Sequence, residues 1–438
     1  MCLKKYLMFS ILLIYTPKIV FTDNAHFYKA PQLHRSSTTC WFDRKKSYEV
    51  SDWYTKIDAS YAYGSTSKCW DKNGHTAPLL NPTGNYNMLY LMENVALEPS
   101  QQNFAEFLGD AIINHSKTND TFGQLEFDGK FRINNFNIDL RQNLVSNFYL
   151  EAHLPIRNLK LYNISYTDKS PATGIFSQQY WAWKIFKNNL NTILSNHNLK
   201  EYNTSYSETG LGDASILLGW QDIETNIDNE HIKLISFGLK SGILFPTGKA
   251  EKTDQVFSIP TGYKKHWGIP LECQLDIGPY DWLTLTLNGG AIIFFDKTLT
   301  KRMQTHSKQQ GLMKLAIGET KERKGSLWHL EFDIKFDHFA SGLSALVGYS
   351  YNRKDKDHLT PSDNSLFDMA TVNYDLSLKA WDMNVLHFMI DYDFSLQLKN
   401  KKLAPKINVF YNYPFNGKNA FKTSMLGAGL GIDIRWKI

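Results

Sequence analysis

The feature that most constrains the fold is a strict alternation of apolar and ionisable side chains in residues 327–337. Because successive side chains of a β-strand point to opposite faces, this segment would have one apolar face and one ionisable face. The apolar face consists of Trp328, Leu330, Phe332, Ile334 and Phe336, and the other of His329, Glu331, Asp333, Lys335 and Asp337. Such a strand suits a soluble sandwich with its charges in water, or a membrane barrel with its apolar face in lipid.

The alternation recurs along most of the chain. It is found in 53–63, 125–133, 136–141, 148–157, 235–245, 267–277, 283–295, 343–351, 372–379, 388–399, 407–413 and 426–438. The pattern predicts an all-β fold, a closed antiparallel transmembrane β-barrel of about 12 strands (10–14). Two helical excursions, at 101–114 and 178–195, are expected in long external loops. A change of phase at Asn134–Asn135 predicts a bulge or a tight turn.

The connections distinguish the barrel from the sandwich. Long connections, at 66–120, 167–207, 247–262, 296–325 and 355–368, roughly alternate with short ones at 145–147, 224–229, 278–281 and 339–342. Outer-membrane barrels have this asymmetry, with short periplasmic turns and long external loops. A secreted β-sandwich is the alternative, and it would have to keep the charges of a dozen strands out of its core.

The two ends of the chain predict export and membrane insertion. Lys4 and Lys5 precede a short apolar run, so we divide the chain into a signal peptide (1–22), an irregular segment (23–50) and an outer-membrane barrel (51–438). The last strand, which ends at Ile438, resembles the C-terminal signature read by the outer-membrane insertion machinery. We therefore expect that machinery as a partner and the outer membrane of a Gram-negative-type bacterium as the location.

Composition limits the partners. Removal of residues 1–22 takes away three lysines and no acid, so the formal net charge falls from +5 to +2, which gives no reason to expect nucleic acid. Aromatic residues make up 14% of the chain, as suits a barrel with aromatic girdles at two membrane interfaces. Cys40 and Cys69 flank the first strand and either pair or stay as thiols, and Cys273 is expected to pack as a small apolar residue. No metal site and no cofactor are predicted.

Two short motifs are similar to a known group. They are Gly-Leu-Gly-Asp-Ala at 210–214, before a strand, and Phe-Pro-Thr-Gly-Lys at 245–249, at the end of the next. Both resemble the outer-membrane proteins associated with meta-pathway phenol degradation. The resemblance covers about 40 residues and implies a barrel that admits small molecules.

The ionisable faces of the strands are the predicted lumen. The lumen-lining set is Asp128, Lys130, Arg132, Asp139, Arg141, Glu151, His153, Glu272, Asp276, Glu331, Asp333, Lys335, Asp337, Asp391, Asp393 and Arg435. Such rings bias the passage of ions and solutes. Alternatively, the charges pair across a narrow lumen and fill it, because small barrels can be filled by side chains.

Two loops carry further hypotheses. Trp183, Phe186, Leu190 and Ile193 have helical spacing and would form either a plug or lid helix, or a helix lying on the barrel rim. The segment 297–324 is strongly basic and could contact outer-membrane lipid and lipopolysaccharide, or stay solvated. Its basic residues are Lys297, Lys301, Arg302, Lys308, Lys314, Lys321, Arg323 and Lys324.

Three functions remain open. The favoured one is a porin-like channel for passive diffusion of small solutes, and the alternative is a structural or surface-interaction barrel with a plugged lumen. The third rests on residues similar to the Ser-His-Asn set of outer-membrane phospholipases: His338, Ser341, Gly342, Ser350, Asn352 and Arg353. Those enzymes place the nucleophile two residues after the histidine, where this chain has Ala340. We therefore predict that the protein is not an enzyme.

Overall fold

The computed structural model describes residues 53–81, 84–91, 121–144, 147–170, 177–200, 204–224, 227, 231–309, 311–394, 397 and 403–436. The predicted signal peptide, the segment 23–50 and the helical excursion at 101–114 lie outside the described residues. So do Cys40, Ile438 and the side chain of Arg435.

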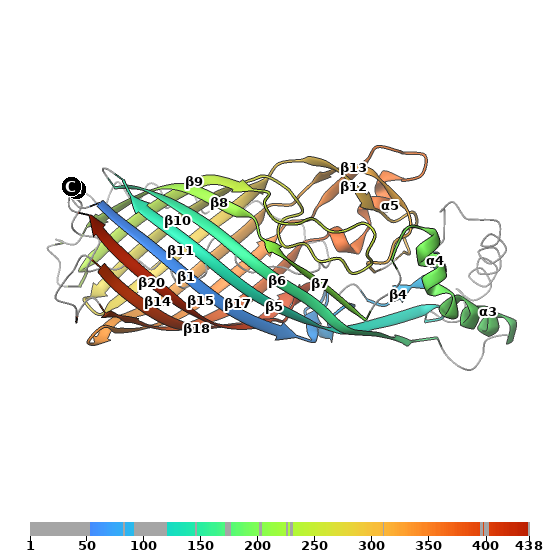
Figure 1. The fold of residues 1–438 in the computed structure, drawn as a ribbon, viewed down its shortest axis with the longest axis horizontal. Helices are drawn as coiled ribbons and strands as arrows, with labels where there is room; N and C mark the ends of the chain where they lie inside the picture. Colours follow the sequence, from blue (N-terminus) through green and yellow to red (C-terminus); the bar gives the residue numbers. More distant parts are fainter. Residues whose placement is uncertain are drawn as a thin grey trace.

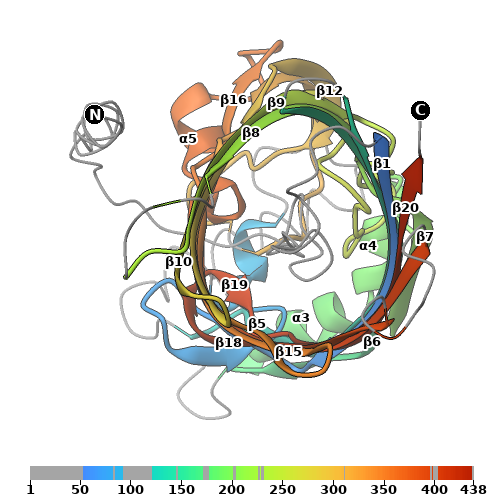
Figure 2. The ribbon, with the colours of Figure 1, turned by 90° about the vertical axis from the view of Figure 1, so that its left-hand side faces the viewer.

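Twelve antiparallel strands of the described chain close into a barrel, seen from the side in Figure 1 and along its axis in Figure 2. The ring runs β5-β1-β20-β18-β17-β15-β14-β11-β10-β9-β8-β6, and a β5–β6 pairing closes it. The ring strands are β1 (Trp53–Thr66), β5 (Gln124–Asn143), β6 (Phe148–Asp168), β8 (Ala214–Glu224), β9 (Leu234–Phe245), β10 (Gly268–Tyr280), β11 (Leu283–Phe294), β14 (Leu327–Ala340), β15 (Leu343–Lys354), β17 (Trp381–Asp393), β18 (Leu403–Lys418) and β20 (Ser424–Trp436). The predicted closed barrel is confirmed.

Short and long connections lie at opposite ends of the barrel. Short ones join β5 to β6, β8 to β9, β10 to β11 and β14 to β15 at the end where β1 begins and β20 ends. The long connections gather at the other end and fold there (Figure 1). By the usual asymmetry of such barrels, the first end is periplasmic and the second extracellular.

The outer surface of the barrel is apolar. Phe332 of β14, Ile390 of β17 and Leu430 of β20 are 43%, 58% and 66% exposed, whereas Asp333, which points the other way, is 1% exposed. A closed ring with an apolar outer band satisfies its backbone groups internally and presents apolar side chains to lipid. The barrel therefore spans a membrane.

Strands β5 and β6 are the longest of the ring. Their apolar side chains face outward near the periplasmic end and inward near the extracellular end. In the lower part of β5, Phe136 and Ile138 point outward, and in the upper part, Phe127 and Phe131 point inward and are buried. The predicted bulge at Asn134–Asn135 is wrong, because β5 and β6 pair in unbroken register through these residues. The backbone alternation continues there, and only the apolar residues move to the other face.

The long connections fold into a cap at the extracellular end. Its elements are β2 (Lys68–Trp70), β3 (Thr76–Pro78), β4 (Tyr86–Asn87), η2 (Met88–Tyr90), α3 (Ser177–Asn188), α4 (Leu190–Asn196), β7 (Ser205–Leu211), β12 (Lys297–Arg302), β13 (Ile317–Arg323), β16 (His358–Pro361), α5 (Met369–Asn373), η3 (Leu376–Leu378) and β19 (Ala420–Phe421). Two three-stranded sheets, β12-β13-β16 and β19-β2-β3, organise it. In the described part of the chain, no helix is both long and apolar enough to span a membrane.

One predicted strand is absent. Residues 372–379 alternate in polarity, yet they form the end of α5 and the turn η3. Two aspartates explain the difference, because Asp368 accepts the backbone N–H of Thr371 (2.8 Å) and Asp375 accepts that of Ser377 (2.8 Å). Aspartates in this position start helices and helical turns. The local caps override the period-2 pattern.

Candidate functional site

The inner face of the barrel carries most of the residues predicted to line it. These are Asp139, Arg141, Glu151, His153, Glu272, Asp276, Glu331, Asp333, Lys335, Asp337, Asp391 and Asp393. Each lies on the strand face opposite to the outward apolar side chains. All except Arg141 and Asp391 are buried. The inner wall is therefore ionic over much of its length, and its side chains are closely packed.

One group of inner charges is organised around Lys240 of β9. Its ammonium lies 2.8 Å from Glu151 on β6 and 3.0 Å from Glu272 on β10. Arg141 of β5 approaches Glu151 at 3.8 Å and lies over the ring of Tyr149 at 3.7 Å. Lys240 is missing from the predicted lumen set. It is the only ionisable residue in the sequence of β9, which is the signal that could have found it.

Further ion pairs and hydrogen bonds line the rest of the wall. They include His153–Asp139 (2.5 Å), Lys56–Asp58 (3.3 Å), Lys406–Asp433 (3.1 Å), Lys335–Asp337 (2.7 Å), Thr284–Asp337 (2.7 Å) and Thr286–Asp276 (2.7 Å). Charges of both signs are interleaved along the wall. Of the inner-face residues named above, eleven are acidic and five are lysine or arginine, so an inner wall of this kind would favour cations over anions.

A chain of hydrogen bonds crosses three strands of the inner wall. Ser350 Oγ on β15 lies 2.7 Å from His387 Nε2 on β17, and His387 Nδ1 lies 2.9 Å from Asn412 Oδ1 on β18. Asn352 Nδ2 donates to Ser350 Oγ (3.0 Å). These are the distances of a serine nucleophile with its histidine base. However, Ser350, His387 and Asn412 are all buried.

Small residues make room for the inner side chains. On the inner face of β20, a Cβ at Gly431 would lie 2.3 Å from the carboxylate of Asp58. On β15, a Cβ at Gly348 would lie 2.0 Å from the carboxylate of Asp333. These glycines therefore leave room for the carboxylates, and a larger residue at either position would make the aspartate side chain move.

Asp128, Lys130 and Arg132 do not line the lumen, contrary to the prediction. They lie on the outer face of β5, because the residues that alternate with them, such as Phe127 and Phe131, point inward and are buried. The ring of Phe131 contacts the ring of a cap residue, Phe421, at 5.2 Å between centroids. The upper part of β5 thus turns its apolar side to the cap and its charges to water.

The predicted plug or lid helix is part of the cap. Helices α3 and α4 lie at the extracellular end of the molecule, beyond the barrel (Figure 1). Trp183 stacks on Phe186 at 5.4 Å, and its indole N–H donates to Asp168 at the end of β6 (2.8 Å). The helices therefore lie at the rim, which is one of the two predicted positions. The four side chains named for them are all buried: Trp183, Phe186, Leu190 and Ile193.

The apolar core of the cap extends into the barrel. Phe127, Tyr86 and Phe257 are fully buried in it, with ring centroids 4.6 Å apart for Phe127–Tyr86 and 5.5 Å for Phe127–Phe257. Inner-face residues of the barrel belong to the same apolar cluster: Ala62, Leu346, Met389, Phe410 and Met425. Lumen and cap are thus continuous, and apolar side chains of this cluster lie among the inner charges, as Leu346 does opposite Lys335.

The two sequence motifs meet where β7 passes into β8. Asp213 of the first motif accepts the backbone N–H of Gly248 of the second (2.7 Å) and that of Tyr263. Thr247 donates to the carbonyl oxygen of Gly212 (2.5 Å). The motifs therefore hold the loop after β9 against the barrel wall.

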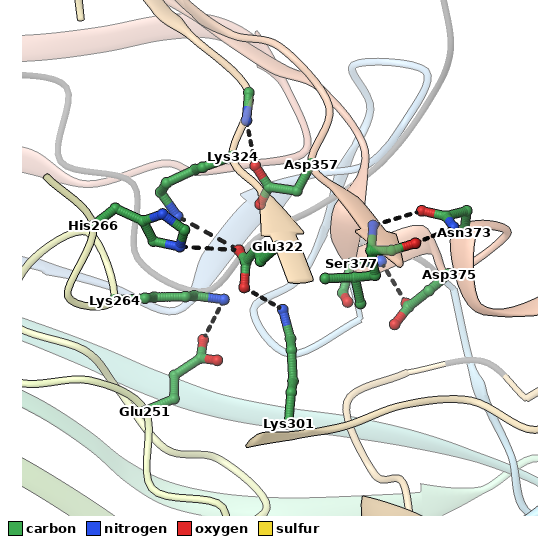
Figure 3. Close-up of polar contacts among 12 residues, drawn as sticks. Glu251, Lys264, His266, Lys301, Glu322, Lys324, Asp357, Asn373, Asp375 and Ser377 are labelled. Carbon is green, nitrogen blue, oxygen red and sulfur yellow. Dashed lines mark hydrogen bonds and ion pairs between the residues drawn. The ribbon is translucent and has the colours of Figure 1, made fainter. Parts of the chain in front are cut away.

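The basic segment 297–324 is folded into the cap, and all eight of its cationic side chains have partners. Lys301 and Lys324 face Glu322 at 3.4 and 3.9 Å, as Figure 3 shows, and Lys314 pairs with Asp375. The others bind Asp296, backbone carbonyls or Tyr90: Lys297, Arg302, Lys308, Lys321 and Arg323. The segment is therefore not a free basic loop.

Burial and neighbouring charges shift the pKa of several groups in the cluster of Figure 3, Glu322 and His266 among them. Burial opposes ionisation of Glu322, but the ammonium groups of Lys301, Lys324 and Lys264 hold the pKa of its carboxyl well below the usual range. Burial, together with the charge of Lys324, lowers the pKa of His266 to about 4. The Nδ1 of His266 bonds to a backbone carbonyl oxygen at 2.9 Å. His266 is therefore neutral near pH 7.

No protein-family model matches the chain, and no curated protein matches it. Among solved structures, an outer-membrane channel from Pseudomonas putida F1 is 11% identical, with a TM-score of 0.46, over 87% of this chain and 95% of that one. A FadL homologue of Pseudomonas aeruginosa is 9% identical (TM-score 0.31, 88% and 90% covered). The toluene transporter TbuX of Ralstonia pickettii is 8% identical (TM-score 0.32, 88% and 90% covered).

The location follows from the geometry. The described strands form a closed, even-numbered antiparallel ring with an apolar outer band. Short connections lie at one end and long, folded connections at the other. This combination is characteristic of bacterial outer-membrane barrels. The chain is a β-barrel of the Gram-negative outer membrane.

Proposed function

We propose that the barrel is an outer-membrane channel through which small solutes diffuse passively. One observation carries the proposal: ionic and polar side chains line much of the inner wall, among apolar ones such as Leu346 and Met389, while the outer wall is apolar. Polar side chains on the inner wall offer solutes a route that lipid does not. No chemical step is needed for this function.

Single-channel recording tests the proposal. The full-length protein is refolded and inserted into a planar lipid bilayer, and the current is measured in KCl. We expect discrete conductance steps, which a permanently filled lumen cannot give. A preference for cations is expected, because acidic side chains outnumber basic ones along the inner wall.

A matched pair of variants relates the current to the inner wall. Asp391 lies half-buried on the inner face of β17, and Asp128 lies on the outer face of β5. Charge reversal by Asp391→Lys should shift the reversal potential in a KCl gradient towards anions. The same change by Asp128→Lys should leave it unchanged. Equal effects of both variants would contradict a pathway along the inner wall.

The second candidate is a structural barrel whose lumen is filled. The close pairing of buried ions, such as Lys240 between Glu151 and Glu272, favours it. A filled lumen predicts no conductance steps from protein that is demonstrably folded and inserted. That result would replace the channel proposal by the structural one.

A further inference from the structure

The outer wall above the lipid band carries two cations that face each other. On β5 and β6 the apolar outer surface ends at Asn134 and Asn158, which are opposite each other in the two strands. One row further from the periplasm, Arg132 lies directly opposite Lys160 on the same outer face. Like charges placed opposite each other in a sheet destabilise it. An anion bound between them would remove this cost.

A hydrogen-bonded collar marks the membrane boundary below this pair. Tyr61 Oη donates to Asn134 Oδ1 (2.7 Å), Asn134 Nδ2 to Asn158 Oδ1 (3.2 Å), and Asn158 Nδ2 to Thr209 Oγ1 (2.5 Å). The collar runs across β1, β5, β6 and β7. On β5 and β6 the outward side chains below it are apolar and those above it are polar. It therefore lies at the level where lipid tails give way to headgroups.

The cations are held in place by an aromatic ring. Arg132 Cζ lies 5.1 Å and Lys160 Nζ lies 5.7 Å from the ring centroid of Tyr162. The guanidinium of Arg132 is charged at any physiological pH. Among the described residues, neither cation forms an ion pair, although each lies on the outer face with part of its side chain accessible. Both charges are thus available to an anion from outside the barrel.

We propose that Arg132 and Lys160, with Tyr162 beside them, bind a phosphate group of lipid A in the outer leaflet. An arginine fork and a lysine at headgroup level match the charge and geometry of a phosphate. The basic segment 297–324, the obvious candidate by sequence, has its cations engaged within the cap. This inference rests on the membrane placement of the barrel and does not depend on whether the lumen conducts.

Binding of lipid A to the full-length protein tests the site. The protein is refolded in detergent, and its affinity for bisphosphorylated lipid A is measured by native mass spectrometry or by titration. The double variant Arg132→Gln/Lys160→Gln should bind lipid A about tenfold more weakly or worse, because charge-assisted hydrogen bonds are lost. Arg132→Lys/Lys160→Arg keeps both charges and should retain most of the affinity.

Two controls make the result decisive. Lys321→Gln/Arg323→Gln removes two cations of the cap that are paired with Asp296, and it should leave the affinity unchanged. Heat-modifiable mobility in gel electrophoresis establishes that each variant is folded. Equal loss with both double variants, or no loss with Arg132→Gln/Lys160→Gln, would overturn the site.

The ligand class is tested separately with dephosphorylated lipid A and inorganic phosphate. Dephosphorylated lipid A should bind wild type and the Arg132→Gln/Lys160→Gln variant alike. Inorganic phosphate should compete only at far higher concentration, because it lacks the acyl chains that lie against the apolar band below. If inorganic phosphate competes as well as lipid A does, the lipid assignment is wrong.

Discussion

The lower and upper parts of the β5–β6 pair are built alike and surrounded differently. Both belong to one antiparallel ladder, whose register shifts once in the upper part, between Asp128 and Lys130, and the side chains of β5 alternate with a period of two in both parts. In the lower part, Phe136 faces outward to lipid, and Asp139 faces inward. In the upper part, Phe127 faces inward to the cap, and Lys130 faces outward. The comparison teaches that an alternating strand has no inherent outside, since the apolar face follows the apolar neighbour.

The largest expected effect comes from replacing two phenylalanines of β5, one in each part of the strand. Phe127→Ala removes a ring that is fully buried in the cap core and should destabilise the protein by about 3–5 kcal/mol. Phe136→Ala removes a ring that is 37% exposed on the lipid side and should have a smaller effect, about 1–2 kcal/mol. Guanidinium unfolding of refolded protein in vesicles measures both. Equal losses would refute the difference between the two environments.

The next test exchanges polarity on the outer face. Ile138→Lys places a charge in the lipid band and should destabilise the inserted barrel by about 2–4 kcal/mol. Lys130→Ile lies on the same face of the same strand above the collar and should change stability by about 0.5 kcal/mol or less. Unfolding titrations in the same vesicles compare the two. A large effect of Lys130→Ile would place the membrane boundary higher than the collar.

A pH titration distinguishes the cap from the barrel wall. His266 has a pKa of about 4 in the folded cap and about 6.5 when unfolded, so between these values the unfolded state binds more protons. The contribution of neutral His266 to the free energy of unfolding is complete above pH 6.5. It decreases as the pH falls from 6.5 to 4, by about 3 kcal/mol at most. Hydrogen exchange of cap amides should report this loss. His266→Gln should flatten the pH dependence, and an unchanged slope would remove His266 as its source.

The smallest expected effect is at Ser350. Its contact with His387 has the distance of a nucleophile with its base, yet both are buried in the wall. We expect a fluorophosphonate probe to give no more labelling of the wild type than of Ser350→Ala, as measured by mass spectrometry of the labelled protein. A Ser350 adduct would contradict the prediction that the protein has no enzymatic activity.

The sequence predicted the architecture well and individual positions less well. Alternation in β14 and β20 predicted the barrel and the outward positions of Phe332 and Leu430. From the same alternation, Asp128, Lys130 and Arg132 were predicted to line the lumen. That prediction assumed that the apolar side chains of a strand face outward, which holds only for residues within the membrane. The alternation also predicted a strand at 372–379, where aspartate caps decide the local structure.

What the chain determined by itself is the two-faced character of its strands, since a period of two follows from the covalent geometry of extended backbone and needs no neighbours. Only the tertiary structure decided which face meets lipid at each height. On β5 and β6 the apolar face changes side at the collar of Tyr61, Asn134, Asn158 and Thr209, which comes together from four strands. The pairing of Lys314 was likewise decided by the tertiary structure, because its acidic partner Asp375 lies outside the segment 297–324.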